Sequence, residues 1–488
     1  MEPLGTITQY FPFLDEDTRN ALQEIMDEVP NYFEFAVKLT DKVLNENCSD
    51  RIVYFAIHHA ALAMDFKVID QIREKYSDRL LLGPYLYFAS AFQGNTDDLK
   101  KVHETADEIL ASKPEDWLVL EMNCMKFEAD MRDYPRTIYG DSLIDTIREY
   151  IANEPRFGFY ETTLNDYLSR RARIDGNVEE RIRCIDRAIE SATKFNDQVR
   201  LVDLLAKKST LIEDVDRGLA RDLLKQAYDM SELVGIPADF AFIIYKIGRL
   251  ESIRGIFDAA IKHFLQSISI KERVGLNVAN DSWELSTVYN MIGESESGLE
   301  WARMTEDQYK SRPLLKPHAI LNQAWSLILL GQETEALILI DSIREEIMKS
   351  GRESLLAWLH FVTGVLEMHD GDYTSAASSI EEALRIYEMQ RDVPLFQLIC
   401  LYHLARIEAT TSQVNEELSP SLAVLEEKAL EEDLPGFLGL VHFLKGELAL
   451  ANNDDSTLRD SVQRLQPLSE MEGMKFLKPF LKCLLEKG

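Results

Sequence analysis

The chain contains 488 residues, of which 46% are hydrophobic and 28% are charged, a composition typical of a folded, soluble protein and not of a disordered one. Asp and Glu number 84 against 53 Lys and Arg, so the formal net charge is −31 and the calculated pI is 4.7. An acidic chain repels phosphate backbones, which disfavours nucleic-acid binding and favours protein or peptide partners. Solubility alone would also explain the charge, so the charge does not identify a partner.

The cysteines and the N-terminal residues indicate a cytoplasmic protein. Five cysteines lie far apart, and their odd number fits free thiols in a reducing compartment better than a disulfide framework or a zinc site. The first residues contain no basic segment followed by an apolar one. The longest apolar runs, such as 240–245 and 327–330, are far shorter than the roughly 18 residues that a membrane helix needs. We therefore expect neither secretion nor a membrane span.

The sequence predicts helices from residue 15 onward, because apolar residues recur at three- and four-residue spacing with few alternating β-branched ones. The expected N-terminal helices are 17–27, 31–44, 52–64, 66–76, 84–92, 97–111, 117–131 and 141–152. Between them we expect turns at 93–95 and 132–134, an insertion at 135–140, and a loop at 153–158.

From residue 159 the predicted turns recur at regular spacing, which indicates a repeat. They fall 38 to 41 residues apart, at Gly176, Val215, Gly255, Gly293, Gly331, Gly371, Ser412 and Asn453. A period near 40 with a turn in its middle predicts an α-solenoid of helical hairpins. We therefore expect N-terminal capping helices (1–48), degenerate hairpins (49–158), a regular array (159–472) and a C-terminal capping helix (473–488).

The segment 357–390 carries the landmarks of a known repeat. Gly364 and Ala376 are small residues where two antiparallel helices cross, Gly371 forms the turn between them, and Asp372 caps the second helix; Tyr373, Ala383 and Leu384 complete the pattern. The segment resembles a tetratricopeptide (TPR) repeat, and the longer period is similar to that of the long-helix TPR arrays of maltose-type activators, peptide-sensing regulators and kinesin light chains. The resemblance implies an all-α, right-handed superhelical solenoid of about eleven repeats.

The sequence contains no phosphate-binding loop, nucleophile elbow, zinc helix or CxxC pair, so we expect no enzyme, cofactor or metal. His58 and His59 are adjacent, and neighbouring residues on a helix point about 100° apart, which argues against one shared metal ion. The pairs Asp97-Asp98 and Asp454-Asp455 lack the third aspartate of a magnesium motif and are better explained as helix caps.

The TPR resemblance also implies a binding surface. In this family the first helix of each repeat lines the concave groove, and in this sequence the corresponding positions hold aromatic, Arg and Asn side chains, which suit an interface. The predicted partner-binding residues are Arg170, Arg173, Tyr245, Arg249, Trp283, Asn290, Trp325, Trp358, Phe361, Tyr402 and Arg406. The arginines would form a positive stripe. Alternatively, the aromatic residues pack repeat against repeat and the arginines pair with acidic residues of neighbouring helices.

Two functions follow from this interpretation. The first is a non-catalytic scaffold or adaptor that binds a segment of a partner protein in the concave groove. The second is a ligand- or peptide-sensing regulatory subunit that acts on a separate effector protein. The oligomeric state is not predicted.

Overall fold

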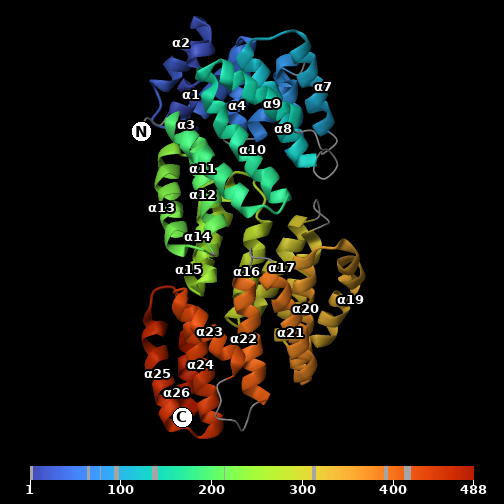
Figure 1. The fold of residues 1–488 in the computed structure, drawn as a ribbon, viewed down its shortest axis with the longest axis vertical. Coiled ribbons are helices and arrows are strands. Elements are labelled where there is room, and N and C mark those ends of the chain that lie inside the picture. The colour runs from blue at the N-terminus through green and yellow to red at the C-terminus, as the bar shows by residue number, and fades with distance from the viewer. Residues whose placement is uncertain are drawn as a thin grey trace. The chain divides into compact units, whose positions relative to one another are not determined.

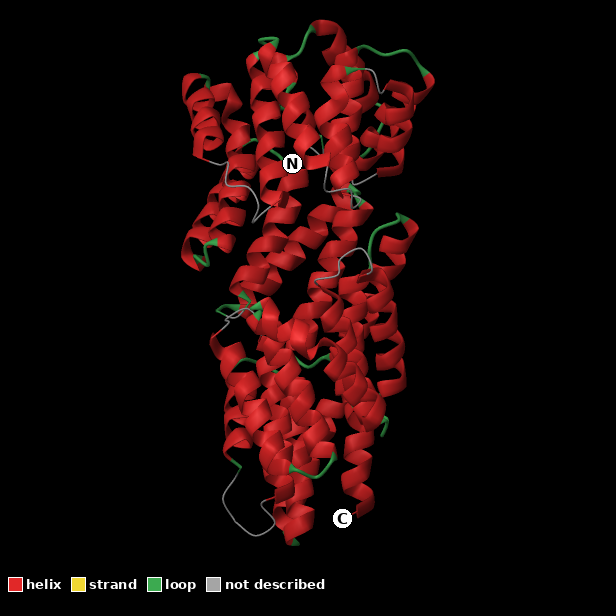
Figure 2. Cartoon of the chain, turned by 90° about the vertical axis from the view of Figure 1, so that its right-hand side faces the viewer, coloured by secondary structure: helices red, strands yellow, loops and turns green. Residues whose placement is uncertain are grey.

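The computed structural model describes residues 4–62, 66–76, 79–92, 98–133, 141–213, 215–309, 315–389, 394–411 and 419–487 (Figure 1). Within these ranges the chain consists of helices joined by turns, and none of these residues forms a strand (Figure 2). The expected all-α class is confirmed. No helix in the described part is long and apolar enough to cross a membrane.

The chain divides into two compact units. Unit 1 comprises residues 1–212 and 218–243, and unit 2 comprises residues 213–217 and 244–488. The helices of unit 1 are α1 (Gly5–Thr8), η1 (Phe11–Phe13), α2 (Glu16–Met26), α3 (Tyr32–Asn45), α4 (Asp50–Leu62), α5 (Phe66–Tyr76), η2 (Leu80–Leu82), α6 (Gly83–Phe92), α7 (Asp98–Ala111), α8 (Asp116–Asp133), α9 (Asp141–Asn153), η3 (Pro155–Phe159), α10 (Tyr160–Ile174), α11 (Val178–Lys194), α12 (Gln198–Ile212), α13 (Arg217–Val234) and the start of α14 (Pro237–Ile253).

Unit 2 continues the same pattern of paired helices. After the rest of α14 its helices are α15 (Phe257–Arg273), α16 (Ala279–Met291), α17 (Ser295–Gln308), α18 (Lys316–Leu329), α19 (Glu333–Ser350), α20 (Glu353–His369), α21 (Tyr373–Met389), α22 (Pro394–Thr411), α23 (Pro420–Glu431), α24 (Pro435–Asn452), α25 (Asp455–Glu470) and α26 (Leu477–Lys487).

The helices stack as a solenoid within each unit. Most helices pack against the next one along the chain, and alternate helices also touch: α4, α6, α8 and α10 form one such row, and α16, α18, α20, α22 and α24 form another. A row of alternate helices is the inner layer expected of hairpin repeats, because the partners of each pair occupy the other layer. The expected solenoid of TPR-like helix pairs is confirmed.

The pair α20–α21 shows why small residues occupy the crossing. A Cβ atom on Gly364 would lie 3.0 Å from the carbonyl oxygen of Ala376 and 2.6 Å from the Ile380 side chain. Gly371 has a φ of +82°, which glycine adopts without strain, and the carboxylate of Asp372 accepts a hydrogen bond of 3.1 Å from the Ser375 amide. Gly364, Gly371 and Asp372 therefore take the crossing, turn and capping roles predicted for them.

Other turns follow the same rule. The backbone has positive φ at Gly176, Gly255, Gly293, Gly331 and Asn453. Asp454 caps α25 by accepting from the amides of Ser456 and Thr457, as expected. The expected turns at 93–95 and Ser412, and the insertion at 135–140, lie outside the described residues.

The N-terminal segment differs from the prediction, in which helices occur only from residue 15 onward. Here α1 and η1 are short helices. Ile7 of α1, Tyr10 between the two helices and Leu14 directly after η1 are buried in unit 1. The segment is too short to show helical periodicity, so only tertiary contacts reveal its role. The expected loop at 153–158 includes most of the 3-10 helix η3, in which Phe157 and Phe159 are buried. Residues 132–133 of the expected turn at 132–134 belong to α8.

In unit 2 the last hairpins return to the first one. The Gly436 amide donates to the Arg254 carbonyl oxygen at 3.2 Å, and the Asp258 amide donates to the Gly473 carbonyl oxygen at 3.2 Å. The ring of Phe257 packs against Phe437, with 5.9 Å between ring centroids. These contacts join residues about 180 to 220 positions apart in sequence, so the turns of the C-terminal hairpins pack directly on the first turn of unit 2.

Candidate functional site

The inner layer of unit 1 surrounds a cavity of about 240 Å³. Five alternate helices, α4, α6, α8, α10 and α12, supply its lining, so each successive hairpin contributes from its inner helix. The charged and phenolic side chains in this lining are Glu121, Glu128, Asp166, Asp203, Arg170, Arg200, Tyr85, Tyr160 and Tyr167. Of the residues predicted from the sequence to bind a partner, Arg170 lines this cavity.

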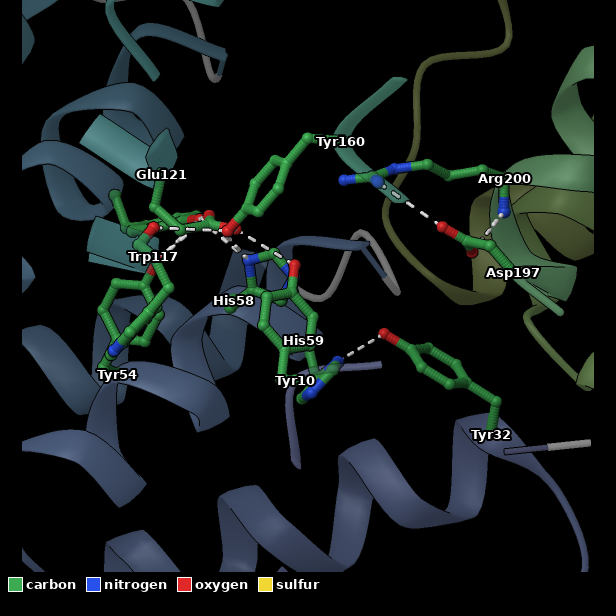
Figure 3. Close-up of polar contacts among 11 residues, drawn as sticks. Tyr10, Tyr32, Tyr54, His58, His59, Trp117, Glu121, Tyr160, Asp197 and Arg200 are labelled. Carbon is green, nitrogen blue, oxygen red and sulfur yellow. Dashed lines mark hydrogen bonds and ion pairs between the residues drawn. The ribbon is translucent and has the colours of Figure 1, made fainter. Parts of the chain in front are cut away.

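The carboxylate of Glu121 lies beside this cavity and accepts four hydrogen bonds from tyrosines (Figure 3). Tyr160 and Tyr10 donate to one oxygen, at 2.7 and 3.1 Å, while Tyr54 and Tyr85 each donate to the other at 3.0 Å. Burial and the nearby Glu121 charge raise the pKa of all four phenols well above the usual value for tyrosine, so all remain donors. Glu121 therefore ties the N-terminal segment to α4, α6, α8 and α10.

The adjacent histidines flank this cluster and point in different directions. The Nδ1 atom of His58 lies 2.7 Å from the Tyr85 hydroxyl, whereas the Nδ1 atom of His59 lies 2.7 Å from the Tyr32 hydroxyl (Figure 3). Burial, helped by the charge of Arg200, lowers the pKa of His58 to about 3. Both rings pack with tyrosines, and no group of three potential metal-ligating residues occurs in the part of the chain that the structure describes.

Arg170 belongs to a network of alternating charges. Its guanidinium donates to both oxygens of Glu128 at 2.8 Å and to Asp166 at 3.0 Å, and Lys207 donates to Asp166 at 2.7 Å. Burial alone would raise the pKa of Asp166, but Lys207 and Arg170 outweigh it and lower that pKa to about 2. Arg170 is thus held in place by two carboxylates and does not contribute net positive charge.

Arg200 enters the cavity from α12 and is held more loosely. Its Nη1 atom lies 3.4 Å from Asp197 (Figure 3). Asp197 is buried and also accepts a hydrogen bond of 3.0 Å from Thr6. Asp197 therefore joins the N-terminal helix α1 to α12. Neither Glu121 nor Arg200 was among the residues predicted from the sequence.

The sequence does hold a signal for Glu121. It is a charged residue with apolar neighbours on the buried side of α8, at a position where a helix of a solenoid would normally carry an apolar side chain. Its four hydrogen-bond donors are the hydroxyls of Tyr10, Tyr54, Tyr85 and Tyr160. These residues are spread over 150 positions of the sequence, so no local pattern connects them. Only the stacking of the hairpins brings them together.

The predicted residues of unit 2 fall into two groups, and the first is an ion-pair cluster. The Nε atom of Arg249 lies 3.2 Å from Glu284 and its Nη2 atom lies 3.6 Å from Glu213, while the Tyr245 hydroxyl donates to Glu284 at 3.5 Å. Burial raises the pKa of Glu284, and the Arg249 charge opposes that rise. The expected positive stripe is therefore not formed at Arg249 or Arg170, because each faces two carboxylates.

The second group is aromatic. Trp325, Trp358 and Phe361 are fully buried, with Trp358 stacked on Phe361 at 4.8 Å between ring centroids and Trp325 edge-on to both. The Trp358 indole donates to Asn322 at 2.9 Å. Trp283 is half-buried and lies 5.5 Å from the Phe396 ring. These aromatic residues pack repeat against repeat in unit 2.

The remaining predicted residues are dispersed. Asn290 is buried and its side-chain oxygen accepts a hydrogen bond of 3.0 Å from Ser326. Tyr402 is buried, and the half-buried Arg406 lies 5.8 Å from its ring centroid. Arg173 is exposed in the last turn of α10. The sequence-predicted set therefore does not form one surface in either unit.

No protein-family model matches the chain, and no curated protein matches it. Among solved structures the chain is similar to apo RapI (11% identity, 80% of this chain and 98% of that chain, TM-score 0.47) and to a Rap protein complexed with Competence and Sporulation Factor (16% identity, 64% and 98%, TM-score 0.45). It is also similar to a signal-transduction ATPase with a tetratricopeptide repeat sensor from Pyrococcus horikoshii (12% identity, 79% and 55%, TM-score 0.43).

Proposed function

We propose that this protein is a non-catalytic binding protein that takes a segment of a partner protein or peptide into the cavity of unit 1. One observation carries the proposal: five successive inner helices direct charged and phenolic side chains into a single cavity of about 240 Å³. A concave site with a few convergent polar groups among apolar ones is the usual form of a binding pocket. In unit 2, the predicted aromatic residues Trp325, Trp358 and Phe361 pack on one another in the core.

The lining favours binding over proton-transfer chemistry. The pKa of His58 is about 3, so its ring is neutral near neutral pH, and the phenols of the Glu121 cluster stay protonated. Only a short part of the partner segment can enter the cavity, because the cavity has room for one or two side chains. Carboxylates outnumber guanidiniums in the lining, which disfavours a nucleic-acid phosphate backbone as the occupant.

The cavity size also favours a second candidate function. A volume of about 240 Å³ lies near the lower end of small-molecule sites, so a ligand or a short peptide could fill it completely. In that case the protein is a sensing regulatory subunit, which passes the effect of ligand binding to a separate effector protein.

Affinity purification from the native cell, with baits that differ only at the cavity, tests both candidates. Ala61 lines the cavity, so Ala61→Phe places a ring inside it, whereas Ala111 is exposed at the end of α7, so Ala111→Phe is a matched control. We expect a molecule that co-purifies with the wild type and with Ala111→Phe, identified by mass spectrometry, to be lost from Ala61→Phe. A protein or peptide supports the adaptor, and a small molecule supports the sensor. Identical recoveries from all three baits would reject the proposal.

A further inference from the structure

We propose that the unit 1 cavity recognises a carboxylate attached to an apolar group, and that Arg200 and Thr163 hold this carboxylate. The inference rests on the proposed function, because it names the chemistry of the group that enters the same cavity. It depends on which polar groups in the lining already have partners and which do not.

Most charges around the cavity are already paired within the protein. Glu121 receives four phenolic hydrogen bonds. Glu128 and Asp166 receive hydrogen bonds from Arg170, and Lys207 also binds Asp166. A guanidinium facing two carboxylates, and a carboxylate with four donors, have little capacity left for a ligand.

Arg200 is the exception. Its side chain donates one long hydrogen bond, 3.4 Å to Asp197, and its other guanidinium donors bond to none of the residues that the structure describes. Figure 3 shows the side chain extending away from its own helix with Asp197 beside the guanidinium. A guanidinium presents a planar pair of donors that matches the two oxygens of a carboxylate.

Thr163 provides a second, independent indication. It lies on α10 in the cavity lining and is buried, yet its hydroxyl has no hydrogen-bond partner among the described residues. Burying a hydroxyl without a hydrogen-bond partner costs free energy, so a ligand that supplies an acceptor would recover that cost. A ligand oxygen provides such an acceptor.

The surroundings select a carboxylate over a phosphate. Glu121, Glu128, Asp166 and Asp203 all line the cavity, and their negative charges disfavour a dianion more strongly than a monoanion. The same lining includes apolar side chains such as Leu204, which would contact an apolar group next to the carboxylate. Both a peptide C-terminus and an acidic side chain can supply this chemistry.

Isothermal titration calorimetry on the full chain tests the proposal with four probes. N-acetyl-leucine carries a C-terminal carboxylate, N-acetyl-leucinamide is its neutral counterpart, N-acetyl-glutamic acid α-amide carries a side-chain carboxylate, and inorganic phosphate is the competing anion. We expect saturable binding of at least one carboxylate probe and none of the amide or of phosphate. The better of the two carboxylate probes identifies the source. Equal binding of N-acetyl-leucine and its amide, or binding of phosphate alone, would overturn the proposal.

Two variants assign the binding to the named residues. Arg200→Lys keeps the charge but removes the planar pair of donors, and we expect it to weaken the carboxylate probe about tenfold or more. Thr163→Val removes a hydroxyl that has no partner, so we expect unchanged or higher stability without ligand but at least about threefold weaker binding. Arg183→Gln, at an exposed arginine of α11, is the control and should bind normally. Normal binding by both cavity variants would overturn the proposal even if the probe binds.

The two proposals fail in different ways. If no probe binds but Ala61→Phe still loses a co-purifying partner, carboxylate recognition is wrong and the binding function stands. If N-acetyl-leucine binds through Arg200 but no partner depends on the cavity, the partner-binding function is wrong and the small-ligand sensor remains.

Discussion

Replacement of Glu121 by glutamine tests whether one buried carboxylate organises unit 1. Its side chain is only 5% exposed and accepts hydrogen bonds from Tyr10, Tyr54, Tyr85 and Tyr160. Glutamine has nearly the same shape, so the substitution changes hydrogen bonding without opening a cavity. Its amide oxygen still accepts two phenolic hydrogen bonds, but its NH₂ group is a donor and cannot accept the other two.

The magnitude follows from the number of bonds lost. A hydrogen bond to a charged group contributes about 1.5–3 kcal/mol, so two lost bonds correspond to about 3–6 kcal/mol before any offset. The neutral amide no longer carries the desolvation cost of a buried charge, which offsets part of that loss. We expect a net decrease of about 3 kcal/mol in the free energy of opening of unit 1, equivalent to a roughly 100-fold change in an equilibrium constant.

Hydrogen exchange read by mass spectrometry measures this effect separately in each unit. In Glu121→Gln, peptides from α4, α8 and α10 should exchange about 100-fold faster than in the wild type, while peptides from α18 and α20 should be unchanged. Glu104→Gln, at an exposed glutamate of α7, should change exchange little. Wild-type exchange rates throughout unit 1 of Glu121→Gln would refute the reasoning, because the four phenols would then not depend on a charged acceptor.

Two further predictions concern other sites. Burial, with the nearby charge of Asp203, raises the pKa of Asp239 to about 8. Between about pH 4 and 8 the native state therefore holds a proton that the unfolded state has lost, so stability falls as pH rises. Asp239→Asn should raise the free energy of unfolding of unit 1 more at pH 8 than at pH 5, and an equal increase at both pH values would contradict the assignment. A Cβ on Gly436 would lie 1.9 Å from the Gly255 carbonyl oxygen, so Gly436→Ala should lower the free energy of unfolding by about 1–3 kcal/mol and accelerate exchange at 254–258. Gly293→Ala, where only the positive φ is affected, should lower the free energy of unfolding by about 1 kcal/mol. If the loss at Gly436 is no larger, the close contact between the Gly255 and Gly436 turns would be wrong.

Local sequence signals predicted the helices and turns well. The helix expected at 66–76 matches α5, and Gly371 and Asp372 take the turn and cap positions assigned to them. These features depend on residues within one hairpin, where periodicity, a positive φ and a capping side chain act over a few positions. The same local logic failed at α1 and η1, because four- and three-residue helices have no periodicity to detect.

The candidate site was only partly predictable. Placing Arg170 on an inner helix follows from the repeat register, and it does line the cavity. Its neutralisation by Glu128, which lies 42 residues away, depends on how one hairpin stacks on another. The same is true of Trp325, whose burial against Trp358 and Phe361 comes from the neighbouring repeat.

The sequence by itself determined a chain of paired helices with a period near 40, because that information is local and repeats along the chain. Only the tertiary structure decided that Tyr10 reaches Glu121, that Arg200 keeps spare donors in a cavity, and that residues near 255 meet residues near 436. Each depends on the accumulated rotation of several stacked hairpins, and small changes per repeat add up along a solenoid. A pattern within one repeat does not encode that sum.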